Sequence, residues 1–111
     1  MNDRQFIETN NQPWLAMEQF PGTAIMPLAE PVAQGSIHKL KMKAGTIIPV
    51  HQHPCDEYVY VLSGIIKTGD REFSEGTFWF TPANTENGSH QAITDVEIIT
   101  IRLGEMGIFA S

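Results

Sequence analysis

Residues 45–64 read GTIIPVHQHPCDEYVYVLSG, and this stretch decides which fold and which site the chain forms. Successive side chains of an extended strand point to opposite faces, so His51 and His53 lie on one face. Glu57 follows four residues later and adds a carboxylate. Two imidazoles and a carboxylate are usual ligands of a divalent transition metal. The stretch therefore predicts a metal site.

Short runs with strand character and turn signals alternate on both sides of this stretch. The turn signals include Ser63-Gly64, Thr68-Gly69-Asp70 and Glu75-Gly76, and this spacing is typical of an all-β barrel or sandwich. No segment keeps a helical period for two turns, and the best helix candidate is 13–20. The expected strands are 24–28, 36–43, 47–53, 58–62, 65–68, 71–73, 77–81, 91–93 and 96–102.

Alternation within two of these runs predicts which side chains face the interior. In the run 36–43, the three lysines fall on one face, while His38, Leu40 and Met42 fall on the other, which we expect to be buried. In the run 58–62, one face carries valines and the opposite face carries two tyrosines and a leucine. A strand that is apolar on both faces is covered on both faces, and the second cover is either the other sheet or another subunit. We take this run as an indication of a homodimer.

The stretch resembles the first sequence motif of the cupins, G-x5-H-x-H-x3-E-x6-G. Every fixed position of that motif is matched, by Gly45, His51, His53, Glu57 and Gly64. The resemblance implies a small single-domain cupin, that is, an RmlC-like jelly-roll barrel (a double-stranded β-helix). It also implies a metal inside the mouth of the barrel, held by the two histidines, the glutamate and one histidine of a second motif.

The second cupin motif, G-x5-P-x-G-x2-H, is matched only in part. Gly76 and Pro82 fit it, but Asn84 replaces the middle glycine and Asn87 stands where the histidine is expected. Two readings remain open. A longer turn brings His90 to the metal as the fourth ligand, which its chemistry favours, or Asn87 faces the metal, which the spacing favours.

A narrower resemblance lies nearer the N-terminus, at Trp14, 20–22 and 27–28. These residues are similar to the entry segment of a cupin subgroup that contains zinc cupin modules of anti-sigma factors and diketone-cleaving dioxygenases. The expected function is an enzyme that acts on a small organic molecule through Fe, Zn, Ni or Mn, as a dioxygenase or as an isomerase or lyase. The alternative is a non-catalytic cupin that binds or senses a metal or metabolite.

Two further residues bear on the site. His38 is expected to face the interior, where it would serve as a hydrogen-bonding or acid–base group near the metal, or simply as a core histidine. Cys55 lies between the predicted ligands, and a loop residue without a chemical role is the simpler reading than a thiolate ligand.

Composition excludes several other classes of protein. The 111 residues suit one domain, which we expect at 13–111 after a flexible or partner-bound N-terminal arm at 1–12. A net charge of −6 argues against nucleic-acid binding, and one cysteine permits no internal disulfide. Without an apolar run of membrane-spanning length or a signal-peptide pattern, the expected location is the cytoplasm.

Overall fold

The computed structural model describes residues 4–106, and its regular structure is β apart from one short 3-10 helix, Thr9–Asn11. This confirms the predicted all-β class. The strands are β1 (Leu15–Ala16), β2 (Thr23–Ala29), β3 (Ser36–Met42), β4 (Ile47–Ile48), β5 (His51–Gln52), β6 (Glu57–Ser63), β7 (Ile65–Thr68), β8 (Arg71–Ser74), β9 (Phe78–Thr81), β10 (Glu86–Asn87), β11 (His90–Ala92) and β12 (Val96–Arg102).

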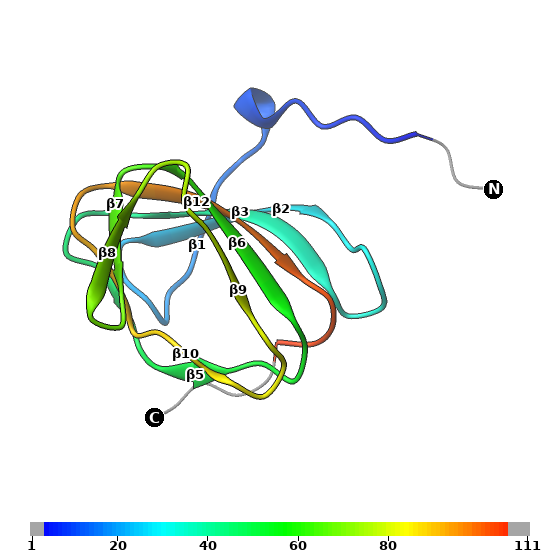
Figure 1. The fold of residues 1–111 in the computed structure, drawn as a ribbon. Coiled ribbons are helices and arrows are strands. Elements are labelled where there is room, and N and C mark those ends of the chain that lie inside the picture. Colours follow the sequence, from blue (N-terminus) through cyan, green and yellow to red (C-terminus); the bar gives the residue numbers. More distant parts are fainter. Residues whose placement is uncertain (1–3, 107–111) are drawn as a thin grey trace.

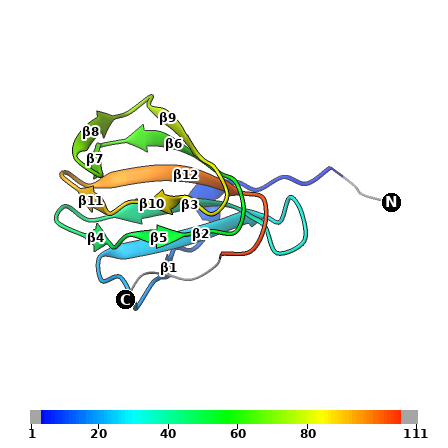
Figure 2. The same cartoon turned by 60° about the horizontal axis from the view of Figure 1, so that its bottom comes forward.

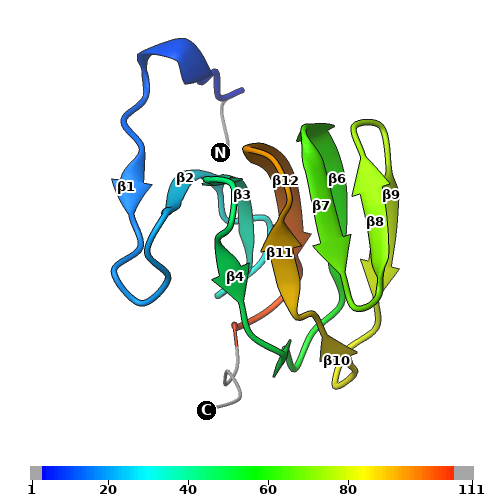
Figure 3. The ribbon, with the colours of Figure 1, turned by 90° about the vertical axis from the view of Figure 1, so that its left-hand side faces the viewer.

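These strands form a jelly-roll barrel of antiparallel ladders. One sheet has the order β1-β2-β3-β12-β6-β9, a second has the order β4-β11-β7-β8, and β5 pairs with β10. Figure 1 shows the strands wrapped around a common interior, with β5 and β10 side by side at one end. Figure 2 brings that end forward and shows β5 in line with β4, and β10 in line with β11. Figure 3 shows the four-stranded sheet from its outer side.

The hydrophobic core fills the space between the two sheets. Its largest contributions come from the inward-facing residues of β3, β6 and β12, which are neighbouring strands of the large sheet. Val61 and Ile66 are fully buried. The buried cluster consists of Phe20, Leu40, Met42, Ile48, Val59, Val61, Ile66, Ala92, Val96 and Ile98. Because these apolar residues lie inside, the barrel can hold polar groups at its end without losing its core.

Alternation along β3 is as predicted from the sequence. His38, Leu40 and Met42 are buried, whereas Lys41 is exposed and Lys39 is partly exposed. The Lys39 ammonium lies 2.6 Å from a carboxylate oxygen of Glu97 on β12. The lysine row is therefore a solvated strand face, which keeps the wet side of this part of the sheet polar.

One predicted strand is wrong in its extent. The expected strand 47–53 is divided in the structure into β4 and β5, because Pro49 interrupts the ladder. A proline has no backbone N–H to donate, so it ends a paired segment. His51 and His53 still share one face despite this break, since both are buried while Gln52 between them is exposed.

Two short strands were not expected. β1 lies within the segment 13–20 that was the best helix candidate, and β10 lies within the region of the second motif. Each contributes only two residues to a ladder, which is too short for a sequence period to register.

Gly64 shows why the first motif ends in glycine. Its φ is +86°, in the left-handed region that side chains other than glycine rarely adopt. A Cβ at this position would lie 2.0 Å from the carbonyl oxygen of Asp95. The turn between β6 and β7 thus requires glycine both for its backbone angle and for the close approach of a second loop.

The outer face of β6 and β9 is apolar and exposed. Tyr60, Phe78 and Phe80 are 44%, 57% and 45% exposed, and the Tyr58 ring stacks on the Phe80 ring at 5.0 Å. The sequence predicted that something packs on this face, and the described part of the same chain does not do so.

The N-terminal segment leaves the barrel in Figure 1, and Phe6 is 81% exposed. No helix among residues 4–106 has the length and apolar character that crossing a bilayer requires. The division into an arm and a barrel domain, and the cytoplasmic location, stay predictions.

Candidate metal centre

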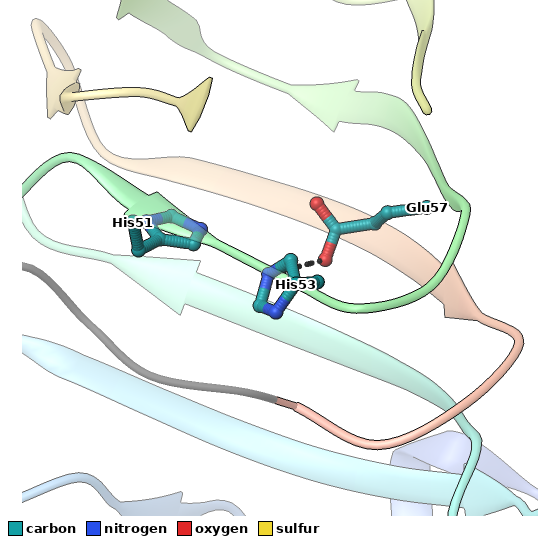
Figure 4. Close-up of side chains that lie close together, drawn as sticks. All are labelled: His51, His53 and Glu57. Atoms are coloured by element: carbon teal, nitrogen blue, oxygen red, sulfur yellow. Dashed lines mark ion pairs between the residues drawn. The ribbon is translucent and has the colours of Figure 1, made fainter. Parts of the chain in front are cut away.

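His51, His53 and Glu57 converge at the end of the barrel where β5 and β6 meet (Figure 4). His51 belongs to β5, His53 follows it in the connecting loop, and Glu57 is the first residue of β6. All three are buried, with 5%, 5% and 6% of their surface exposed. One ligand atom from each lies within 4.8 Å of the others, so the three side chains are placed to hold a metal ion.

Backbone carbonyls orient both imidazoles. His51 Nδ1 donates to the Pro49 carbonyl at 2.8 Å, and His53 Nδ1 donates to the Met106 carbonyl. A carbonyl oxygen can only accept, so each Nδ1 carries its proton, and in a neutral ring the lone pair is on Nε2. Metal-binding histidines in proteins usually have this arrangement, in which the second nitrogen is held by a hydrogen bond.

The contact between His53 and Glu57 needs either a proton or a metal ion between the two groups. His53 Nε2 lies 3.1 Å from a carboxylate oxygen of Glu57, as Figure 4 shows. If the ring is neutral with its proton on Nδ1, a lone pair faces a carboxylate, which is repulsive. Either a second proton or a metal ion removes that repulsion. Two ligands about 2.1 Å from one metal and at right angles to it are about 3 Å apart, so the observed spacing fits a metal.

The ionisation of Glu57 and His51 suits cation binding, whereas a metal would have to displace a proton from His53. Burial opposes the charged form of Glu57, but the hydrogen bond to His53 and the nearby imidazoles outweigh it and lower the pKa of Glu57. Burial disfavours protonated His53, yet Glu57 outweighs it and raises the pKa of His53. Burial lowers the pKa of His51 despite its bond to Pro49. An anionic carboxylate beside a neutral His51 is the form that a metal takes up.

His90 lies at the border of this group. It is 8% exposed on β11, and its ring centroid is 5.6 Å from that of His51. Its Nδ1 is hydrogen-bonded to the Thr68 hydroxyl at 3.0 Å, and its ring stacks on Trp79 at 5.8 Å. Burial, followed by the charge of His51, lowers the pKa of His90 to about 4, so its ring is neutral.

Asn87, the alternative to His90, is in β10, and its backbone pairs with that of His51. Its side chain lies outside the described part of the structure. Which of the two residues is the fourth ligand stays a prediction.

His38 lines the same cavity as the three candidate ligands, as predicted for an inward-facing residue of β3. Its Nδ1 is 2.7 Å from the Ser36 hydroxyl. Burial, helped by the charge of Arg102, lowers the pKa of His38 to about 4. His38 is therefore a neutral imidazole that can accept a proton.

The cavity beside the candidate ligands is small, about 90 Å³. Its polar walls are His38, His51, His53, Glu57, His90, Thr100 and Arg102, and its apolar walls are Met17, Phe20, Ile25, Leu40, Ile48, Val59, Ile98 and Met106. A larger hollow of about 460 Å³ lies beside Lys41 and Asp95. That hollow has no histidine in its lining, so the chemistry is concentrated in the smaller cavity.

Sequence reasoning missed three residues near the site. Met106 orients His53, Thr68 binds His90, and Arg102 lines the cavity. The alternation of β12 could have indicated Arg102, because it continues the inward series of Ile98 and Thr100. Cys55 is buried and its thiol contacts the Glu105 carbonyl, and burial raises the pKa of the Cys55 thiol. A neutral buried thiol agrees with the simpler reading of a residue without a chemical role.

Comparisons with known proteins give a family and a fold. The family model described as "ChrR Cupin-like domain" matches residues 2–107. No curated protein matches the chain significantly. Among solved structures, an RmlC-like cupin protein from Ralstonia eutropha JMP134 has a TM-score of 0.80 at 22% identity, covering 92% of this chain and 69% of its own.

Two further solved structures bear names that describe an activity. A candidate acetylacetone dioxygenase from Methylibium petroleiphilum PM1 has a TM-score of 0.87 at 14% identity, over 100% of this chain and 83% of its own. An acetylacetone dioxygenase from Acinetobacter johnsonii has a TM-score of 0.76 at 15% identity, over 94% and 75%. Identities this low establish the shared fold alone.

Proposed function

The chain is a member of the ChrR Cupin-like family, and we propose that it is a metal-dependent enzyme that acts on a small organic molecule with dioxygenase-like chemistry. The observation that carries the proposal is the buried group of His51, His53 and Glu57, whose ligand atoms lie within 4.8 Å of one another beside a cavity. Two structural neighbours with acetylacetone dioxygenase names support the choice of chemistry.

In this proposal, His51, His53 and Glu57 hold a divalent metal, Fe, Zn, Ni or Mn, with His90 as fourth ligand and Asn87 as the alternative. When bound, the metal would polarise the oxygen atoms of a substrate and hold them for reaction. Three or four protein ligands are fewer than such metals accept, so a substrate can bind directly. The carbonyls of Pro49 and Met106 keep the two imidazoles in the tautomer that a metal requires.

His38 is the proposed acid–base residue, because it lines the same cavity as the ligands. Its pKa of about 4 makes it a neutral but weak base near pH 7, so it would hold a substrate proton only briefly before returning it. The Ser36 hydroxyl, 2.7 Å from its Nδ1, fixes the orientation of the ring. The apolar walls of the cavity exclude water, which strengthens electrostatic interactions at the site.

A second candidate function is a non-catalytic module that binds or senses a metal or metabolite. The small volume of the cavity favours it, because about 90 Å³ is well below the usual 300–1,000 Å³ of ligand pockets. His38 in the cavity favours the enzyme, since a module that only binds a metal has no need of a proton-transfer residue.

The test separates the two candidates. We expect freshly purified protein to contain a divalent metal by elemental analysis, and the iron-loaded form to consume oxygen with a β-diketone in a panel of diketones and catechols. A His38→Gln variant should keep the metal but lose turnover. Metal without any turnover across the panel would favour the binding module, and protein that neither contains nor takes up metal would refute both.

We further propose that the protein is a homodimer formed through the outer face of β6, β9 and β12. Tyr60 pairs in register with Phe78 and Ile99, and Tyr58 pairs with Phe80 and Ile101, so two apolar rows cross three strands. The occupant that fits is a second copy of the chain, because a two-fold axis brings the same apolar rows together. Each copy carries a net charge of −6, so without such an apolar contact the two copies would repel each other.

Sedimentation equilibrium tests the dimer. We expect the wild-type protein to have twice the mass of one chain and Phe78→Lys to have the mass of one. Ile47→Lys is the control, since Ile47 is 55% exposed on the other sheet. A monomeric wild-type protein, or a Phe78→Lys variant that stays dimeric, would refute this interface.

A further inference from the structure

The cavity beside the candidate metal ligands holds a permanent positive charge. Arg102 is the last residue of β12, where Val96, Ile98 and Thr100 face inward, so it belongs to the inward-facing series. It lines the cavity together with His38 and Glu57. A guanidinium is a cation with five N–H donors and no acceptor, so it brings a positive charge and hydrogen-bond donors to the cavity.

The strand register places Arg102 beside the proposed metal. Arg102 pairs with Glu57 of β6 on one side and with Ser36 of β3 on the other. In the next inward row, Thr100 pairs with His38 and Val59. Directly opposite residues on one face of a sheet have Cβ atoms about 4.5–5.5 Å apart. The register therefore puts the Cβ of Arg102 beside that of Glu57, with His38 diagonally across in the next inward row.

Arg102 is half-buried, and one of its donors is buried without a partner in the described part of the chain. Its Nε is buried and has no hydrogen-bond partner among the described residues. The ion pairs found in residues 4–106 join Lys39 to Glu97 and His53 to Glu57, so none of them neutralises Arg102. Burying an unsatisfied donor of a charged group is unfavourable, and a bound ligand that accepts a hydrogen bond from it would remove that cost.

The size and lining of the cavity restrict the ligand. A volume of about 90 Å³ admits only a few non-hydrogen atoms, so sugars, nucleotides and peptides are too large. The lining also includes the apolar residues Phe20, Leu40 and Ile48, which suit a short alkyl group. A ligand that suits both kinds of wall is small, with an apolar part and an anionic part.

We propose that Arg102 anchors the oxyanion of a small organic substrate, so that the ligand bridges its guanidinium and the metal held by His51, His53 and Glu57. The anion is a carboxylate of a short 2-oxo acid or the enolate of a short β-diketone, since both present an oxygen anion next to a second oxygen. Arg102 acts here as a specificity-determining residue. This inference rests on the proposed function, because it assumes a metal at the other end of the ligand.

Isothermal titration calorimetry on zinc-loaded protein tests the anchor without relying on turnover. The probes are pyruvate, acetylacetone and the uncharged pyruvamide. We expect at least one of the two oxyanion sources to bind wild-type protein, and pyruvate to bind more tightly than pyruvamide if the carboxylate is the source. Arg102→Met should weaken binding about ten- to a hundredfold at unchanged zinc content, because hydrogen bonds to charged groups contribute about 1.5–3 kcal/mol.

Two further variants make the result specific. Arg102→Lys keeps the charge without the forked donors and should bind with intermediate affinity. Arg71→Met is the matched control, because Arg71 is on β8 and stacks over the Phe73 ring at 5.1 Å. It should bind the probes as the wild type does. Circular dichroism of each variant verifies that the barrel is folded.

The outcomes separate this inference from the function it rests on. Equal affinity of Arg102→Met and wild type, or no binding of either anion to the zinc-loaded wild type, would overturn the anchor. Zinc content by elemental analysis reports on the metal site independently. If the protein takes up no zinc, the proposed function fails, whereas titration of the metal-free protein would still reveal whether anion binding depends on Arg102.

Discussion

Replacing His51 by Ala tests the metal site most directly. With free zinc at 100 times its dissociation constant, binding stabilises the wild-type protein by about 2.7 kcal/mol. At roughly 4 °C per kcal/mol for a domain of this size, the midpoint of thermal unfolding should rise by about 11 °C. Loss of one of the protein ligands should weaken binding at least about a hundredfold, since even supporting hydrogen bonds contribute ten- to a hundredfold.

At the same zinc concentration, His51→Ala should then gain only about 0.4 kcal/mol, or less than about 2 °C. The substitution also leaves the Pro49 carbonyl without the donor that His51 Nδ1 supplies at 2.8 Å, which should cost about 1–3 kcal/mol in the metal-free protein. The hydrophobic core lies elsewhere, so the variant should still fold.

Differential scanning calorimetry with and without zinc, together with elemental analysis, measures both effects. Gln52→Ala is the control, because Gln52 is exposed in the same strand β5 and should show the full wild-type shift. If His51→Ala showed an undiminished rise in its unfolding midpoint and an unchanged zinc content, His51 would not be a ligand and the reasoning from its tautomer would be wrong.

Three other expectations concern the fold and the cysteine. Gly45→Ala should lower the free energy of unfolding, measured in urea, by about 1–3 kcal/mol, because Gly45 has a positive φ. Gly64→Ala should lower it by more, because Gly64 also has a positive φ and its added Cβ would clash with Asp95. Equal losses for the two variants would contradict this. Ile66→Ala should cost about 2–5 kcal/mol while metal content stays unchanged, and a smaller loss would mean that the core rearranges around the cavity. Cys55, buried and with a raised pKa, should react with iodoacetamide more than about tenfold faster in urea than in buffer, and equal rates would show that its thiol is accessible in the folded state.

Much of the barrel could be predicted from the sequence because its long strands alternate strictly. The inward positions of β3 and β12 follow from a period of two, and β7 and β12 have the predicted bounds. Gly64, Gly69 and Gly76, the glycines of the predicted turn signals, all have a positive φ, so they mark their turns correctly. What the period could not indicate was the break at Pro49, where β4 and β5 separate but the histidines still share a face.

The site was predictable in its local part only. His51, His53 and Glu57 lie within seven residues of sequence, so their proximity follows from spacing. Thr68 and Met106 reach the site through strand pairing and through the segment after β12, which no local pattern encodes, whereas the alternation of β12 indicates that Arg102 faces inward. His90 could be predicted only in part. A histidine is a usual metal ligand, but the spacing of the second motif does not give the length of the turn before His90.

The hydrogen bond between His53 and Met106 has a practical consequence for work with this protein. The Met106 carbonyl, 53 positions away in the sequence, holds the His53 imidazole in its orientation, so the segment that follows β12 helps to position a candidate ligand. Because the acceptor is a backbone carbonyl, replacing the Met106 side chain leaves it in place, and only a displacement of the backbone in this segment would change how His53 is held.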